Sequence, residues 1–141
     1  MRCYEASQEI AATAEDVWAV LTEPGRLQAA ETGVVRIEGD VREGERIRVW
    51  SEVAPDRAFP VRVTRLERPR VMEWTGGAPL GLFTGVRRFT LTPAGPHTRL
   101  EVREEFTGPL LPLVWRTMPD LTASFETFVR GVARAAEAVT R

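Results

Sequence analysis

The apolar residues in the last third of the chain recur at gaps of three and four. This spacing predicts one amphipathic helix over residues 118–139, with a single apolar stripe and a polar opposite face. Thr117 is expected to cap this helix, with Asp120 reaching back as its capping-box partner. A helix of about 33 Å needs a broad apolar surface to lie on. The stripe comprises Met118, Leu121, Phe125, Phe128, Val132, Ala136 and Val139.

The part of the chain before this helix is expected to provide that surface as a curved β-sheet. Residues 2–10 predict a first strand, and Thr13 is placed to cap a short helix that stops at Pro24-Gly25. Between residues 35 and 107, apolar and polar side chains alternate, and turn residues separate the segments. This pattern is typical of an antiparallel sheet with one buried face.

Local irregularities in this pattern give further expectations. Residues 26–31 are expected to add one helical turn, and Leu110 to Trp115, bounded by prolines, a separate apolar turn or short helix. Val35 and Ile37 are expected to share the buried face of their strand. Trp50 has the parity of charged neighbours, so it either lies on the outer face or marks a β-bulge that shifts the register.

The last two strands predict the most informative polar feature of the sequence. Residues 83–93 and 98–107 flank a short turn, and every second residue from Arg99 to Glu105 is charged, which assigns that parity to the outer face. An arginine and a glutamate then fall side by side on the apolar inner face. In simple register the facing pairs are Leu91 with Leu100, Phe89 with Val102, and Arg87 with Glu104.

Composition and charge limit the classes of partner and chemistry. The net charge is −1 with acidic and basic residues interleaved, whereas a nucleic-acid-binding face usually needs clustered basic residues. No apolar run approaches the ~20 residues of a membrane span, and no leader pattern starts at Met1. With one cysteine, Cys3, and one histidine, His97, we expect no metal, no cofactor and a cytoplasmic protein. The length predicts one domain over residues 1–141.

The order of strand, short helices, antiparallel strands and long helix resembles the SRPBCC superfamily, which includes START-like and polyketide-cyclase-like proteins. The matching segments are residues 11–21, 72–74, 88–93, 98–100 and 105–109, so the resemblance covers essentially the whole chain. It implies an α+β helix-grip fold, in which a curved antiparallel sheet of six or seven strands wraps around the C-terminal helix, with two short helices after the first strand.

The resemblance also implies a mostly apolar cavity between the sheet and the long helix, which is the usual form of a small-molecule site. Strand parity then assigns the residues that would line this cavity. They are Gln8, Val35, Val49, Ser51, Val63, Trp74, Phe83, Arg87, Phe89, Val102, Glu104, Met118, Leu121 and Phe125.

Three functions stay open at this point. The first is a carrier or sensor, monomeric or homodimeric, that binds a hydrophobic or aromatic small molecule in the cavity. The second is an aromatase/cyclase-like or dehydratase-like enzyme on a polyketide-like carbonyl substrate, with Arg87 orienting the carbonyl and Glu104 as the base. The third is a protein-interaction or stress-response module acting through loop 76–85, which displays Leu80 and Leu82.

For Arg87 and Glu104 themselves we favour a structural role, either as a buried ion pair that satisfies itself or as a pair near the sheet edge that reaches water. The arginine would also hold the glutamate ionised, which opposes its use as a base. We favour the small-molecule binder, because the sequence offers no catalytic constellation apart from this pair.

Overall fold

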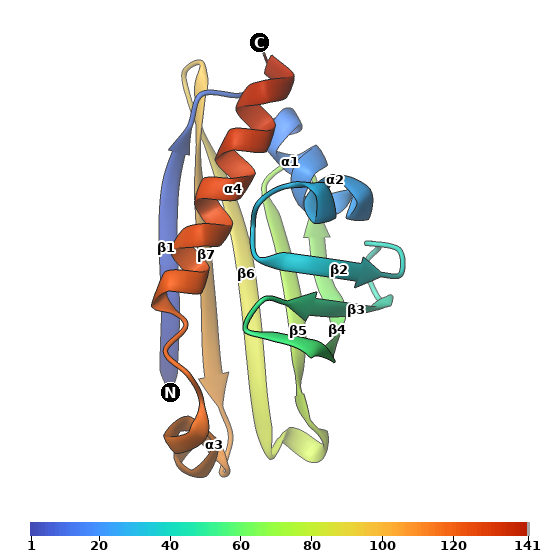
Figure 1. The fold of residues 1–141 in the computed structure, drawn as a ribbon, viewed down its shortest axis with the longest axis vertical. Coiled ribbons are helices and arrows are strands. Elements are labelled where there is room, and N and C mark those ends of the chain that lie inside the picture. Colours follow the sequence, from blue (N-terminus) through green and yellow to red (C-terminus); the bar gives the residue numbers. More distant parts are fainter. Residues whose placement is uncertain (141) are drawn as a thin grey trace.

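The fold is a seven-stranded antiparallel sheet that curls around a long C-terminal helix, seen in a computed structural model that describes residues 1–140 (Figure 1). The sheet order is β1-β7-β6-β5-β4-β3-β2, so the first strand pairs with the last. The predicted α+β helix-grip architecture is confirmed, with seven strands. The elements are β1 (Arg2–Ile10), α1 (Ala14–Thr22), α2 (Pro24–Ala29), β2 (Val34–Glu38), β3 (Arg46–Ser51), β4 (Ala54–Glu67), β5 (Val71–Ala78), η1 (Pro79–Gly81), β6 (Phe83–Ala94), β7 (His97–Thr107), α3 (Leu111–Thr117) and α4 (Thr122–Thr140).

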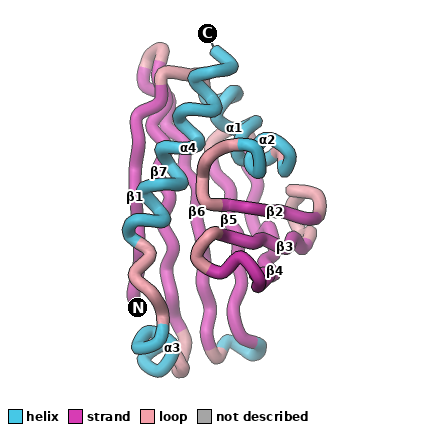
Figure 2. The backbone as a smooth tube through the Cα atoms, in the orientation of Figure 1, coloured by secondary structure: helices cyan, strands magenta, loops and turns pink. Residues whose placement is uncertain are grey.

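The core lies between the concave face of the sheet and the helices. Helix α4 runs along β1 and β7, and α1 and α2 cover the same face beside it (Figures 1 and 2). Helix α3 lies at the opposite end of the molecule from α1 and α2 (Figure 2). The buried stripe of α4 includes Phe125, Phe128, Val132 and Ala136 as predicted, whereas Val139 is half exposed.

The β6–β7 hairpin has the register that strict alternation predicts. Leu91 faces Leu100, Phe89 faces Val102, and Arg87 faces Glu104. On the outer face, Arg99 pairs with Glu101 and Arg103 with Glu105. Alternation settles the register here because a slip of one residue would turn the four charged side chains of the outer parity, Arg99, Glu101, Arg103 and Glu105, into the core.

The predicted start of the long helix is wrong by four residues. Helix α4 begins at Thr122, and its first intrahelical hydrogen bond runs from the Phe125 N–H to the Leu121 carbonyl. Asp120 takes the capping role, because its Oδ1 accepts from both the N–H and the hydroxyl of Thr122 at 2.9 and 2.7 Å. Thr117 instead donates its hydroxyl to the Val114 carbonyl and ends α3, the separate short helix that the flanking prolines predicted.

The Asp120 cap predicts an acid-sensitive start of α4. The two hydrogen bonds from Thr122 lower the pKa of the Asp120 carboxyl below its ordinary value of 3.8. Because the folded-state pKa is lowered, the stabilisation is complete above the unfolded-state value and is lost as the pH falls through the folded-state pKa. We expect Asp120→Asn, which keeps an acceptor but cannot titrate, to flatten the fall of the unfolding midpoint below about pH 4. Thermal unfolding by circular dichroism checks this, and parallel curves for the two proteins would contradict it.

Two β-bulges account for the differences in the small strands. The register of β2 shifts between Val34 and Arg36, so Val34 is buried and Val35 is exposed, and the predicted inward position of Val35 is wrong. A second shift between Val49 and Ser51 leaves Trp50 without a pairing partner on β4. The guanidiniums of Arg36 and Arg48 each lie 5.1 Å from the Trp50 ring centroid. Both interpretations of Trp50 therefore hold, since it is an outer-face residue at a bulge.

The first helices also differ slightly from expectation. Thr13 caps α1 as predicted, accepting from the Asp16 N–H at 3.1 Å. Helix α1 ends at Thr22, before Pro24 as predicted. Pro24 is also the first residue of α2. The predicted turn over residues 26–31 therefore starts two residues earlier, because proline is well suited to the first position of a helix.

Candidate functional site

The candidate site is centred on an ion pair on the concave face of the sheet. Arg87 Nε donates to Glu104 Oε1 at 2.9 Å, and Nη2 lies 2.7 Å from the same oxygen. The two side chains are 27% and 16% exposed, so they are neither fully buried nor free in solvent. Strands β6 and β7 position them as a directly facing cross-strand pair.

Neighbouring strands and α4 complete the surroundings of this pair. Tyr4 of β1 faces Glu104, and Trp74 of β5 faces Arg87, so the four residues form one row across the concave face. On the helix side of the concave face, Phe125 of α4 contacts the pair, with the Arg87 guanidinium 4.7 Å from the ring centroid of Phe125. Such a cation–π contact is electrostatically favourable and orients the guanidinium against the helix.

Two facing glycines lie in the strands next to the ion pair, and one of them, Gly85, makes room for the Glu104 carboxylate. Gly85 of β6 lies opposite Gly76 of β5. A β-carbon at Gly85 would lie 2.7 Å from Glu104 Oε2 and 3.2 Å from the Phe106 ring, and one at Gly76 would lie 2.9 Å from Val61. The carboxylate of Glu104 therefore occupies the space over a residue that has no side chain.

Glu104 Oε2 is the oxygen of this pair that stays available. Both contacts from Arg87 go to Oε1, and within residues 1–140 Oε2 has no hydrogen-bond partner. A carboxylate oxygen held by one arginine on its neighbouring oxygen can still accept from a further donor.

An aromatic cluster lies on the α3 side of the ion pair. Phe83 and Phe106 stack with ring centroids 5.8 Å apart, and Tyr4 stacks on Trp115 at 5.3 Å. Tyr4 also contacts Phe125 at 5.8 Å, which joins the cluster to α4. The predicted lining included Phe83 and Phe125 but omitted the other three. Strand alternation places Phe106 inward together with Glu104, although the predicted lining left it out, and the same parity as Gln8 places Tyr4 inward.

One buried polar atom next to this site has no partner. Among the described residues, Trp74 Nε1 is the single buried side-chain nitrogen or oxygen that lacks a hydrogen bond. Its indole is 3% exposed and packs edge-on against Phe89 with centroids 4.8 Å apart. An unsatisfied buried donor costs about 1–3 kcal/mol, so an acceptor that reached this N–H would recover that free energy.

Val35 of the predicted lining is exposed, and the other thirteen residues divide into two groups. One group is closely packed core, in which sheet and helix side chains fill the concave face and Phe89 contacts Phe128 of α4 at 5.7 Å. Its members are Val63, Trp74, Phe89, Val102 and Phe125. The other group is partly exposed and comprises Gln8, Val49, Ser51, Phe83, Arg87, Glu104, Met118 and Leu121.

The structure does not bring all of the partly exposed group together. Gln8 faces Leu100, two cross-strand rows from Glu104, and donates its amide to the neighbouring Glu9 carbonyl. Val49 and Ser51 lie on β3, which is separated from β6 by two strands. The compact part of the predicted site is therefore Arg87 and Glu104 with Trp74 and Phe125 around them.

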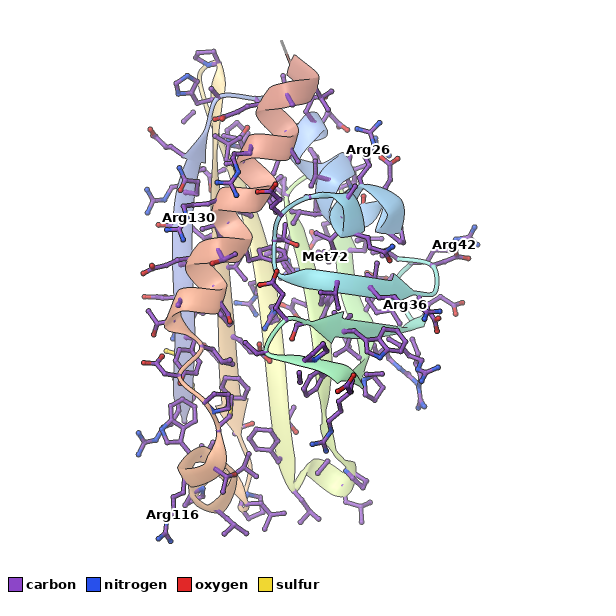
Figure 3. The ribbon with its side chains drawn as sticks, viewed as in Figure 1. Arg26, Arg36, Arg42, Met72, Arg116 and Arg130 are labelled. Atoms are coloured by element: carbon purple, nitrogen blue, oxygen red, sulfur yellow. The ribbon has the colours of Figure 1, made fainter. Side chains whose placement is uncertain are left out.

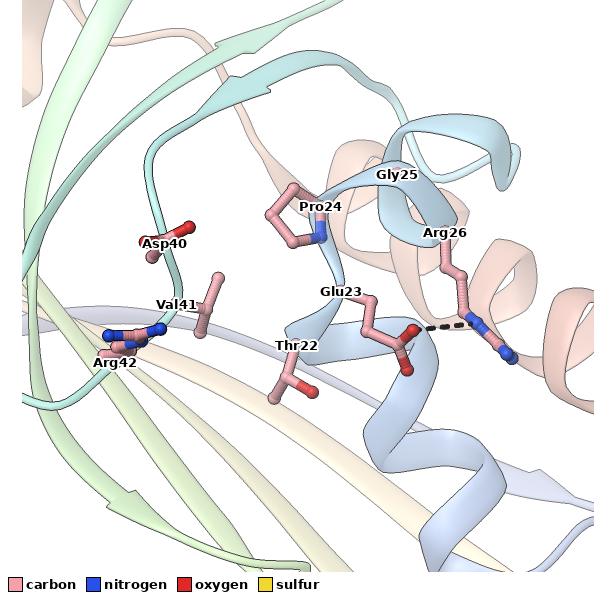
Figure 4. Close-up of a pocket in the computed structure, with 8 residues that line it drawn as sticks. All are labelled: Thr22, Glu23, Pro24, Gly25, Arg26, Asp40, Val41 and Arg42. Atoms are coloured by element: carbon pink, nitrogen blue, oxygen red, sulfur yellow. Dashed lines mark ion pairs between the residues drawn. The ribbon is translucent and has the colours of Figure 1, made fainter.

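Two surface hollows lie away from this pair. One, of about 450 Å³, lies between the α1–α2 junction and the β2–β3 loop and is lined by residues 22–26 and 40–42 (Figure 4). Its Glu23 and Arg26 already pair with each other at 3.3 Å. The other, of about 480 Å³, lies on the outer face of β1, β7 and β6. Within residues 1–140 neither hollow is lined by an unpartnered buried polar atom, so the concave-face pair is the better candidate.

The described residues contain no group of three or more His, Cys, Asp or Glu side chains arranged to hold a metal ion. Cys3 and His97 are both exposed. Over the same part of the chain, no helix combines the length and apolar character needed to cross a bilayer.

The fold and its site define a class of proteins in which a curved sheet grips a C-terminal helix. The profile of the family described as polyketide cyclase / dehydrase and lipid transport matches residues 1–137. The chain belongs to this family, and the resemblance to the SRPBCC superfamily is thereby confirmed. None of the curated proteins matches the chain in sequence.

Solved structures agree on the fold. Protein MLL2253 from Mesorhizobium loti superposes with a TM-score of 0.75 at 16% identity, covering 97% of this chain and 98% of that one. A point mutant of norcoclaurine synthase from Thalictrum flavum, in complex with a transition-state analogue, gives 0.72 at 16%, covering 99% and 96%. DynU16, a putative protein of the dynemicin biosynthetic locus, gives 0.73 at 21%, covering 97% of this chain and 48% of that one. At these identities the likeness establishes the fold alone.

Proposed function

We propose that this protein binds a hydrophobic or aromatic small molecule, which carries a polar group, at the partly exposed end of the concave face. The observation that supports this most is the Arg87–Glu104 pair, which lies among apolar and aromatic side chains yet stays partly exposed. A buried or half-buried ion pair often adds little to the free energy of unfolding, because apolar residues of similar volume in its place are often equally stabilising. Its presence on this face is better explained by recognition of a ligand.

The neighbouring groups define the chemistry of that ligand. Phe83 and Trp115, which are partly exposed and pack on the buried ring of Phe106, offer ring faces and edges for an aromatic or acyl body. Arg87 supplies a cation for a carbonyl or anionic oxygen, and Glu104 Oε2 is free to accept from a ligand hydroxyl. Because Trp74 Nε1 is fully buried, a ligand acceptor reaches it only if nearby side chains move.

A second candidate is an enzyme of the cyclase or dehydratase kind. The unpartnered Oε2 of Glu104, held over Gly85, is the observation that favours it, because a proton-abstracting carboxylate needs a free oxygen. In that case Arg87 would polarise the substrate carbonyl, and both residues would be needed for turnover.

The test uses a fluorescent aromatic anion, 1-anilinonaphthalene-8-sulfonate, together with native mass spectrometry of protein purified from its own host. We expect Arg87→Met to weaken the affinity for the probe about tenfold, through loss of a charge-assisted hydrogen bond. Glu104→Gln should strengthen it, because removal of the carboxylate leaves the arginine available to the sulfonate. The matched controls are Arg88→Met and Glu73→Gln, which alter an ion pair on the opposite face of the neighbouring strands.

Because the affinity for the probe is expected to fall in one variant and rise in the other, the pair of variants distinguishes binding at Arg87 and Glu104 from non-specific hydrophobic binding. Equal affinities for all four variants, or a wild type that neither binds the probe nor retains a small molecule, would overturn the proposal. Cooperative thermal unfolding of each variant, and of the double variant R87M/E104Q, excludes loss of the fold as the cause. If Glu104→Gln keeps a retained ligand but stops its conversion, the enzyme becomes the correct function.

A further inference from the structure

Four exposed leucines gather at one end of the molecule, where the β5–β6 connection meets the start of α3. Leu80 is 97% exposed, Leu113 63%, Leu82 39% and Leu110 37%. We call these four residues the leucine tip. The two segments that carry them form one unit, because the Leu110 N–H donates to the Leu82 carbonyl at 2.9 Å. Gly108 lets them approach closely, since a β-carbon there would lie 2.5 Å from that carbonyl oxygen.

Leu80 is held in a backbone conformation that leucine avoids. It is the single non-glycine residue of the described chain with positive φ, at φ 61° and ψ 24°. The left-handed region is disfavoured for residues that carry a β-carbon. The side chain gains no compensating burial, because it projects almost wholly into solvent. A strained residue that displays an apolar side chain outward indicates a surface built for contact.

The charge at the leucine tip differs from that of the rest of the chain. The protein has 20 acidic and 19 basic residues, yet residues 74–86 and 106–119 contain no carboxylate, and Arg116 is their one charged residue. Arg116 points away from the molecule at this end (Figure 3). Arg2 adds a second cation here, with its guanidinium 5.1 Å from the ring centroid of Trp115.

We propose that the leucine tip docks this protein onto the surface of an anionic phospholipid bilayer. Protruding leucines insert among acyl chains, a tryptophan suits the interface, and cations flanking the apolar residues complement lipid phosphates. A second copy of the chain is the weaker occupant. An interface between two copies places the same positive charges on both partners, and a projecting leucine would need a matching apolar pocket.

The location of the leucine tip gives this docking a use. Phe83 and Phe106, which stack on each other, lie on β6 and β7 between the leucine tip and the Arg87–Glu104 pair. The end that would touch the bilayer is therefore the end nearest the partly exposed part of the concave face. The docking itself does not depend on the proposed ligand site and is tested without any ligand.

The experiment is vesicle flotation of the full chain with two lipid compositions. One is phosphatidylcholine alone, and the other contains about 30% phosphatidylserine; the amount of bound protein gives the partition coefficient. We expect the double variant L80S/L113S to lower partitioning into the anionic vesicles at least tenfold, because each leucine contributes apolar burial. The matched control is V35S/V53S, which removes two other exposed apolar side chains, one on β2 at 43% exposure and one in the β3–β4 turn at 52%.

Two single variants distinguish a loss of vesicle binding from a loss of folded structure. Arg116→Gln should weaken binding about fivefold to the anionic vesicles but leave any binding to neutral ones unchanged. Leu80→Gly removes the strained conformation, so it should not lower the unfolding midpoint while it still weakens partitioning.

Three results would overturn the proposal. The first is no partitioning of the wild type into either kind of vesicle. The second is equal loss of binding for L80S/L113S and V35S/V53S. The third is a wild type whose elution volume shows self-association that L80S/L113S abolishes, without a change in vesicle binding, which would assign the leucine tip to a second copy of the chain.

Discussion

Phe89→Ala is expected to lower the free energy of unfolding by about 3–5 kcal/mol. Phe89 is 0% exposed in the middle of β6, and its ring contacts both Trp74 of β5 and Phe128 of α4. The substitution removes the aromatic contacts that join the sheet to the long helix, and the surrounding strands cannot close the space left behind. Urea denaturation followed by tryptophan fluorescence and circular dichroism measures the change.

The control for this prediction is Phe59→Ala on β4, where the ring is 46% exposed. It should cost less, about 1 kcal/mol, because nearly half of the side chain stays in water in the folded state. A loss below about 1.5 kcal/mol at Phe89 would contradict the close packing described above. It would mean that sheet and helix enclose open space at this level, and that ligands could enter further than the Arg87–Glu104 pair.

Gly131→Ala is expected to destabilise the protein by about 3 kcal/mol, against the usual trend for glycine inside a helix. An alanine normally stabilises a helix interior by up to about 1 kcal/mol relative to glycine. At Gly131 its β-carbon would lie 2.1 Å from the Glu31 carbonyl oxygen and 2.8 Å from the Thr32 nitrogen. These are backbone atoms of the connection between α2 and β2, so α4 would have to move away from it.

Gly25→Ala is the matched control, because nothing lies within 4 Å of a β-carbon at that position in α2. It should be neutral or slightly stabilising. The two alanine variants thus differ in sign for the same chemical change, and thermal unfolding of both gives the comparison. Equal midpoints for the two variants would show that α4 does not pack against the α2–β2 connection as described.

Much of the fold follows from patterns that the sequence displays plainly. The β6–β7 register was predictable because every second residue of β7 from Arg99 to Glu105 is charged, and the Thr13 cap because its partner lies three residues on. The start of α4 was not predictable by the same rule. Thr117 and Asp120 both satisfy capping patterns, and the choice depends on whether Thr117 ends the preceding helix, as it does.

The bulge in β2 was equally hidden. Val34, Val35 and Ile37 are all apolar, so either Val34 or Val35 can take the inward position, and the register against Ser51 and Trp50 decides between them. A bulge is a property of two paired strands, whereas alternation is read along one strand.

The candidate site was predicted in its polar part and missed in part of its aromatic surroundings. Arg87 and Glu104 lie on one hairpin, so local parity brings them together. Tyr4, Phe106 and Trp115 come from β1, β7 and α3, and their contact requires the pairing of the first strand with the last. The extent to which side chains fill the concave face is likewise a matter of three-dimensional packing and has no sequence pattern of its own.

The placement of β1 has a consequence for how the protein acquires its structure. Ser7 receives a hydrogen bond from Arg99 across 92 residues, and the Ala11 N–H donates to Glu137 across 126. Contacts of such sequence separation slow folding, because the chain must lose the entropy of a long loop before they reward it. The β6–β7 hairpin can form locally within microseconds. During synthesis, β1 therefore has no pairing partner until β7 has been made. Of the seven strands, the one translated first is among the last to pair.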